Sequence, residues 1–177
     1  MHEIEHLSHL IKEKNTIEDK IAAITGRPAL IGHTGEYIAS IIFNICLEES
    51  ATSSGYDGRF TRGKLNGNTV NVKWYPKNER ILDIRAEYLP DYYLVFTGPD
   101  ASAESSHNKT RPWLICSAFL FDAREIVSKL KSRGVKIGVG TSVLKEHWNS
   151  AEIYPMQRNP NLLLSSKQRE MLELFRS

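Results

Sequence analysis

Residues 55–76 read GYDGRFTRGKLNGNTVNVKWYP and contain the pattern that decides the fold. Residues 69–75 alternate apolar with polar side chains, which is typical of a strand that buries one face. Residues 56–60 form a second strand candidate, and Asn66 and Gly67 between the two runs favour a turn. The stretch therefore predicts a β-hairpin with one polar and one apolar face. The polar face would carry Asp57, Asn71 and Lys73, and the apolar face Tyr56, Val70, Val72 and Trp74.

Three more runs of the chain have the composition of strands. Residues 92–97 and 113–121 are rich in aromatic and β-branched side chains, and residues 135–139 form a short apolar run. We expect Asp83 and Asp91, which flank the run at 92–97, to be strand-end residues. With the hairpin, these runs predict a central mixed sheet of five strands whose first three members form a meander. Helices on its faces would make the chain an α/β protein.

Helices are predicted at both ends of the chain and beside the sheet. Apolar residues have helical spacing over residues 4–11, and a cap-like pattern at residues 15–19 predicts a fresh helix that ends at Gly26. A further helix is predicted after residues 34–36. Its apolar stripe consists of Ile38, Ile41, Ile42, Ile45 and Cys46.

Two helices are predicted in the second half of the chain. Asp122, with Glu125 three residues later, resembles a capped helix start, and Gly134 would end that helix. Residues 165–175 have the apolar spacing of a terminal helix.

The chain has 177 residues, a net charge of +2, an apolar fraction of 41% and a charged fraction of 25%. These values are ordinary for one globular domain. No apolar run approaches the length of a membrane span, and the first residues lack the apolar block of a signal peptide. Cys46 and Cys116 lie in apolar segments, which predicts reduced core cysteines. We therefore expect a cytoplasmic protein with no membrane segment.

Asp57, Asn71 and Lys73 together suit one kind of chemistry. Carboxylate and amide oxygens are ligands for Mg²⁺, and an ammonium group beside them can orient or deprotonate a water molecule. These residue types on one face indicate metal-dependent hydrolysis of a phosphodiester, with Mg²⁺ or Mn²⁺ as the cofactor. An ordinary explanation stays open, because an aspartate beside glycine often forms a turn and a strand lysine often points into solvent.

These residues and the order of the elements resemble the PD-(D/E)XK nuclease superfamily, the restriction-endonuclease-like fold. In that superfamily an acid on the second strand of the core meander precedes an acid-x-Lys tripeptide on the next strand, and a glutamate on the first core helix often completes the site. The resemblance assigns Asp57 to the first acid, Asn71, Val72 and Lys73 to the tripeptide, and Glu36 to the helix acid. It implies that Asp57, Asn71 and Glu36 bind the metal. Glu36 also has an ordinary explanation, since an acid in the first turn of a helix is favoured by the helix dipole.

Four stretches of the chain also resemble a group of small bacterial proteins. They are GHTGEYIASIIF (32–43), GYDGRF (55–60), VNVKWY (70–75) and PDYYLVFTGP (90–99). The resemblance implies a single restriction-endonuclease-like domain over residues 1–177. Its parts would be an N-terminal helical extension (1–28), a core (29–140) and a C-terminal extension (141–177).

Asn71 departs from the superfamily pattern, which usually has a carboxylate at this position. A neutral amide contributes less binding energy to a hard dication than a charged group does. Three functions therefore stay open. The first is a metal-dependent endonuclease acting on nucleic acid, DNA in particular. The second is a catalytically inactive module of the same fold that binds nucleic acid or a protein partner, and the third is a structural or assembly protein.

Basic residues surround the motif. Between Arg59 and Arg80 the sequence holds six basic residues and one acid, a pattern that arises from a solvated hairpin or from an anionic ligand. Residues 98–112 are small and polar, and they predict a surface loop; a flap that orders on a polyanion through Lys109 and Arg111 is the functional alternative. Cleavage of both strands would need two sites, so a homodimer is a further prediction. The residues expected to contact nucleic acid are Arg59, Arg62, Lys64, Lys77, Arg80, Lys109 and Arg111.

Overall fold

The structure, a computed structural model, describes residues 2–49, 55–100 and 111–176. It has a mixed six-stranded sheet flanked by helices, which confirms the α/β class and corrects the strand count from five to six. The strand order is β1-β2-β3-β5-β6-β8, formed by Ile45–Leu47, Gly58–Phe60, Thr69–Tyr75, Tyr92–Thr97, Ser117–Asp122 and Glu152–Tyr154. A separate small sheet pairs β4 (Ile81–Leu82) with β7 (Thr141–Ser142).

β2 and β3 form the predicted antiparallel hairpin, in which Gly58 lies opposite Val70. β1 pairs antiparallel with the other edge of β2, so β1, β2 and β3 form a meander. β5 lies parallel to β3, and the predicted meander is therefore wrong in its third member, residues 92–97. Parallel neighbours need a crossover rather than a tight turn, and the chain between β3 and β5 is long enough to provide one.

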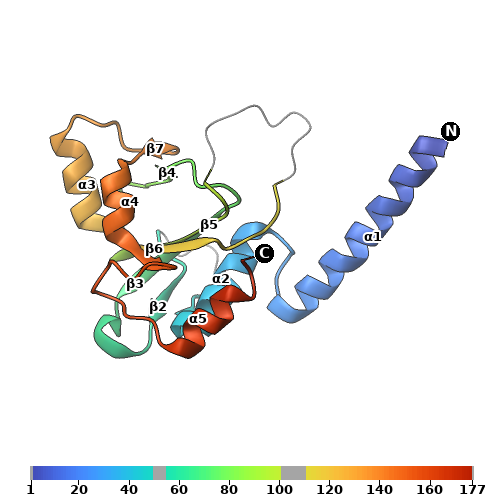
Figure 1. The fold of residues 1–177 in the computed structure, drawn as a ribbon, viewed down its shortest axis with the longest axis horizontal. Helices are drawn as coiled ribbons and strands as arrows, with labels where there is room; N and C mark the ends of the chain where they lie inside the picture. Colours follow the sequence, from blue (N-terminus) through green and yellow to red (C-terminus); the bar gives the residue numbers. More distant parts are fainter. Residues whose placement is uncertain (1, 50–54, 101–110, 177) are drawn as a thin grey trace.

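The first face of the sheet packs against α2 (Ile31–Phe43) and α5 (Ser166–Glu173) (Figure 1). Burial along β3 alternates as predicted, with Val70, Val72 and Trp74 buried on this face. α2 approaches β3 closely at Gly35, where an added Cβ would lie 3.2 Å from the Cβ of Trp74. A glycine at this position therefore permits the contact between helix and strand.

The second face packs against α3 (Ala123–Ser132) and α4 (Lys145–Ala151), which lie over β5 and β6 (Figure 1). Trp148 of α4 meets Phe119 and Phe121 edge to face, with ring centroids 4.8 and 4.9 Å apart. Residues 141–177 thus supply a strand of the main sheet and helices on both of its faces.

α1 (His2–Thr25) is one continuous helix, so the predicted break at residues 15–19 is wrong. The Thr16 hydroxyl donates to the Lys12 carbonyl within the helix instead of capping a new one. Gly26 has a φ of +70° and ends the helix as predicted. No helix in the described part of the chain combines the length and the apolar composition that a membrane crossing requires.

α2 begins at Ile31, before the predicted start, because residues 34–36 are helical themselves. Ile38 and Ile42 are buried as predicted, but Ile41 is exposed, and Ile45 belongs to β1. An apolar run that passes from a helix directly into a strand has no single period, which explains the error. Glu36 consequently lies in the second turn of α2, so a first-turn effect of the helix dipole does not account for it.

In the second half of the chain, both predicted helix starts are confirmed and one predicted strand is wrong. The Asp122 side chain accepts a hydrogen bond from the Glu125 amide at 2.9 Å and caps α3. A capping box at Ser165 begins α5. The predicted strand at residues 135–139 is wrong, since this segment has no strand structure and Val139 is 91% exposed.

The two cysteines are free, as predicted, but the prediction that both are core residues is wrong. Cys46 is exposed on β1, and Cys116 is half-buried. Cys46 alternates with the buried Ile45 along β1, so its side chain lies on the exposed face of this strand.

Candidate functional site

β2 is shorter than β3, and a cavity lies beside β3 at the end where β2 begins. Gly58 and Arg59 pair with Val70 and Thr69, and among the described residues no strand pairs with the rest of this edge of β3. The cavity measures about 430 Å³. Its walls come from α2, the segment before β2, β3, β5 and the segment after β4. The charged and amide side chains in its lining are Glu36, Asp57, Asn71, Lys73, Asp83 and Arg85.

All four residues that the sequence assigned to a catalytic site line this one cavity. Asn71 and Lys73 alternate with buried residues along β3, and so they face away from the first core. Asp57 comes directly before β2, and Glu36 projects from α2. Tyr56 was predicted on the apolar face but instead lines the cavity, because the regular strand begins only at Gly58.

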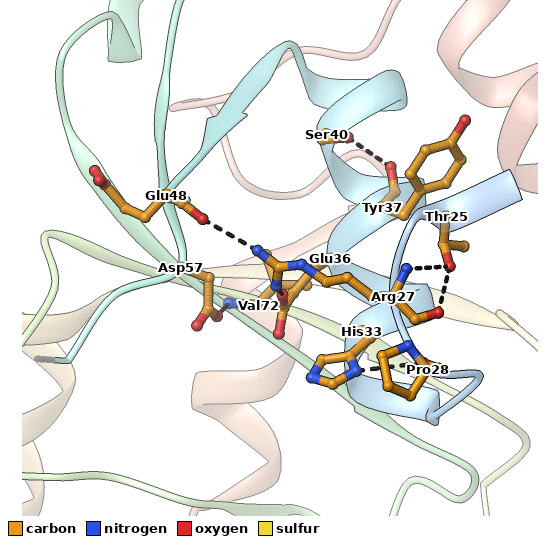
Figure 2. Close-up of polar contacts among 10 residues, drawn as sticks. All are labelled: Thr25, Arg27, Pro28, His33, Glu36, Tyr37, Ser40, Glu48, Asp57 and Val72. Atoms are coloured by element: carbon orange, nitrogen blue, oxygen red, sulfur yellow. Dashed lines mark hydrogen bonds and ion pairs between the residues drawn. The ribbon is translucent and has the colours of Figure 1, made fainter. Parts of the chain in front are cut away.

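Asp57 extends the hairpin ahead of the first residue of β2. Its amide donates to the Val70 carbonyl at 2.9 Å. Figure 2 shows the second bond, in which Asp57 Oδ2 accepts from the Val72 amide at 2.7 Å. The Val72 amide of β3 thus bonds to a side-chain oxygen where a longer β2 would offer a backbone carbonyl. Burial raises the pKa of the Asp57 carboxyl, and the Val72 hydrogen bond and the charge of Lys73 oppose this effect.

Glu36 is held by an arginine from outside the predicted site. Arg27 donates from Nη1 to Glu36 Oε2 at 2.7 Å and from Nη2 to the Glu48 carbonyl at 3.1 Å (Figure 2). Burial raises the pKa of Glu36, the negative charge of Asp57 raises it further, and Arg27 opposes both. The Asp57 carboxylate is therefore close enough to disfavour the ionised form of Glu36.

Lys73 and Asn71 complete the group. Burial lowers the pKa of the Lys73 ammonium, while the nearby charges of Asp57 and Asp83 act in the opposite direction. The amide oxygen of Asn71 is buried, and the described chain supplies no hydrogen-bond partner for it. A buried oxygen of this kind is costly unless a ligand, an ion or a water molecule satisfies it.

Four residues around the cavity were not predicted from the sequence as site residues. Tyr75 accepts a hydrogen bond from the Asp83 amide at 3.0 Å, and burial strongly raises its pKa. Asp83 was predicted to be only a strand-end residue, but it lines the cavity and accepts from the Gly140 amide at 2.6 Å. Tyr75 shares the alternation of Asn71 and Lys73 and could have been found from it. No local signal marks the other missed residues, Arg27, Asp83 and Arg85.

Asp91, in contrast, has the strand-end role that the sequence predicted. Its Oδ2 accepts hydrogen bonds from the amide and the hydroxyl of Thr69, both at 2.8 Å. These bonds fasten the start of β3 to the start of β5.

The residues predicted to contact nucleic acid are distributed over several parts of the molecule. Arg59 donates to the Tyr56 hydroxyl at 3.1 Å, and Lys64 donates to Asn161 at 3.4 Å. Lys77 follows the opposite end of β3 from these residues, about 20 Å away for a strand of this length. The other predicted members have different settings: Arg62 and Arg80 are exposed on turns, Arg111 is exposed, and Lys109 lies outside the described residues.

Comparison of the chain with models of known protein families finds no match, and comparison with curated proteins finds none either. A function therefore has to be argued from the cavity and its residues.

Proposed function

We propose that this protein is a metal-dependent nuclease that hydrolyses phosphodiester bonds of nucleic acid, DNA in particular, at the cavity beside β3. The observation that carries the proposal is the meeting of Asp57, Asn71, Lys73 and Glu36 in one cavity. These residues come from three separate parts of the chain, α2, the segment before β2, and β3. A cytoplasmic location stays a prediction from the sequence.

The arrangement of the strands supports a restriction-endonuclease-like core. α2 is followed by the antiparallel meander β1-β2-β3, with Asp57 directly before the second strand and Lys73 on the third. The resemblance predicts a helix followed by a three-stranded meander. In the structure the meander consists of β1, β2 and β3, whereas the sequence predicted β2, β3 and β5. We therefore also propose that the protein has a restriction-endonuclease-like core.

The oxygen donors of the cavity fit a hard divalent cation. Among the described residues no group of three His, Cys, Asp or Glu side chains could hold a metal, so an amide would have to be the third protein donor. Asp57 and Glu36 each have one carboxylate oxygen in a hydrogen bond within the chain, and the Asn71 oxygen has no partner there. Mg²⁺ accepts a mixed set of carboxylate, amide and water oxygens. Asp57, Asn71 and Glu36 would hold it.

A bound Mg²⁺ would offset the negative charge that builds up on the phosphate during hydrolysis. Lys73 has the position and the lowered pKa of a group that orients the attacking water and accepts its proton. Asp57 and Glu36 favour the charged form of Lys73, and burial favours its neutral form. Arg85 places a positive charge in the same cavity, where it suits a phosphate oxygen.

Nicking of supercoiled plasmid in the presence of Mg²⁺ or Mn²⁺ tests the proposal. The wild type should convert supercoiled plasmid to the open circular form, and Asp57→Ala should not. Excess EDTA should stop the reaction. A folded wild-type protein and a folded Asn71→Asp variant that are both inert on DNA and on RNA with either metal would contradict the proposal.

An inactive binding module is the second candidate, and one observation favours it. Arg27 already neutralises Glu36, so the cavity has less negative charge available for a cation than the sequence suggested. In that case the protein should bind nucleic acid with a salt-dependent affinity that Mg²⁺ does not increase. Titration of DNA in EDTA and then in Mg²⁺ separates the two candidates.

A further inference from the structure

α1 presents apolar side chains that the rest of the described chain does not cover. The helix has no buried residue, and it extends away from the body of the protein (Figure 1). Uncovered apolar surface of this kind marks an interaction site. The large apolar side chains that are 47–68% exposed on α1 are Ile4, Leu7, Leu10, Ile11, Ile17 and Ile24.

The spacing of the residues on α1 is that of a coiled coil. A series with alternating intervals of three and four residues runs along one side of the helix, and Lys14 is its single polar member. This is the heptad pattern with which two helices pair along a shared seam. The series consists of Leu7, Leu10, Lys14, Ile17, Ile21 and Ile24.

We propose that α1 is the homodimer interface of this protein and pairs antiparallel with α1 of a second copy. In this register the first residues of one series face the last residues of the other. Leu7 would pack against Ile24, Leu10 against Ile21, and Lys14 against Ile17, and the twofold axis would repeat each contact. The inference is independent of the chemistry proposed for the cavity.

The charges beside the seam select this orientation. In the antiparallel pair, Glu13 lies opposite Lys20 of the second copy on both sides of the axis. A parallel pair would instead bring Glu13 against Glu18 and Lys14 against Lys14. Sliding the antiparallel pair by one heptad would bring Glu13 against Glu13 or Lys20 against Lys20. Only the proposed register matches opposite charges.

The polar side of α1 does not suit an anionic membrane surface. Helices that lie on such surfaces carry an excess of lysine and arginine. α1 has five acidic and three basic residues. A second copy of the chain is therefore the occupant that both the seam and the charges fit.

Sedimentation velocity of the full chain over a range of concentrations tests the proposal. The wild type should be a dimer, and Ile17→Glu should weaken association by on the order of a hundredfold or more, since it removes two buried isoleucines per dimer. Asn15→Glu is the matched control, because it adds the same charge outside the seam and should leave the dimer intact. Circular dichroism should show that every variant is folded.

Charge reversal tests the orientation. Glu13→Lys should weaken the dimer by roughly tenfold, because it opposes Lys20 of the second copy, and the double variant Glu13→Lys with Lys20→Glu should restore it. In a parallel pair, Glu13→Lys would instead strengthen association by relieving its contact with Glu18. A monomeric wild type, a dimer that Ile17→Glu leaves intact, or a dimer that Glu13→Lys tightens would overturn the proposal.

Discussion

The Asp57 carboxylate accepts a hydrogen bond from the Val72 amide at 2.7 Å, and this bond joins the residue directly before β2 to the middle of β3. The same carboxylate lines the cavity beside Glu36 and Lys73. One side chain thus completes the hairpin and supplies charge to the candidate site, so its structural and chemical roles can be separated by substitution.

Asp57→Asn should stabilise the protein at neutral pH in metal-free buffer. Burial raises the pKa of Asp57 in the folded chain, so the folded state binds the proton more tightly than the unfolded state. The free energy of unfolding contributed by this group therefore falls as pH rises from the ordinary carboxyl pKa through the raised one. Asparagine retains an acceptor for the Val72 amide and removes the charge. Thermal unfolding should show a higher midpoint for the variant at pH 7 and a much smaller difference at about pH 4, near the ordinary carboxyl pKa.

Asp57→Ala is the matched comparison for stability. It leaves the Val72 amide without its acceptor, which costs about 1–3 kcal/mol for a buried group. The midpoint of thermal unfolding should fall below that of Asp57→Asn at every pH. Equal midpoints for the two variants would show that the hydrogen bond does not stabilise the hairpin.

Lys73→Ala should slow plasmid nicking by about a hundredfold to ten-thousandfold, the usual contribution of a positioned group that transfers a proton. Lys73→Arg keeps the positive charge but cannot give up its proton at accessible pH. If Lys73 accepts a proton, both variants should be slow, and the wild-type rate should rise with pH through the lowered pKa of Lys73. Full activity of the arginine variant would leave only an electrostatic role.

Asn71→Asp should lower the Mg²⁺ concentration at which nicking is half-maximal by about tenfold, because a carboxylate binds a hard dication more strongly than an amide does. Asn66→Asp adds the same charge at the exposed turn of the hairpin and is the control. The titration would count against Asn71 as a metal ligand if the two variants responded alike.

Arg85→Ala should weaken binding to duplex DNA by several-fold and reduce the slope of log affinity against log salt by about 1, as expected for the loss of one phosphate contact. Arg124→Ala removes an exposed arginine from α3, outside the cavity lining, and should leave the slope unchanged. Fluorescence anisotropy in EDTA measures both slopes. An affinity that is indifferent to salt would favour a structural role for the basic residues.

The parts of the fold that were predictable are those with local signals. Alternation gave the bounds of residues 69–75, and aromatic and β-branched composition gave those of residues 92–97. The turn at Asn66 and Gly67 predicted the hairpin. β1 and β8 have three residues each, too few for a period to show, and unlike the equally short β2 they have no turn signal that links them to a longer strand. The parallel pairing of β3 with β5 depends on contacts across the sheet, which no local pattern contains.

The candidate site divides in the same way. Asp57, Asn71 and Lys73 lie in one hairpin, so strand periodicity was sufficient to place them together. Glu36 was found through the resemblance, since nothing in the hairpin indicates which helix covers its edge. Arg27 and Arg85 reach the site from connections between elements, and their side chains are placed by tertiary packing that neither propensity nor spacing describes.

The length of α1 would determine how far apart the two copies of a dimer bind a nucleic acid. A helix of 24 residues is about 36 Å long. In the antiparallel pair, the sheet domains of the two copies would lie at opposite ends of the paired helices. Their cavities would therefore engage one polymer at two distant points instead of at neighbouring phosphates. Such a bivalent protein gains avidity only for ligands long enough to span the paired helices, so short oligonucleotides should bind as they would to a single copy.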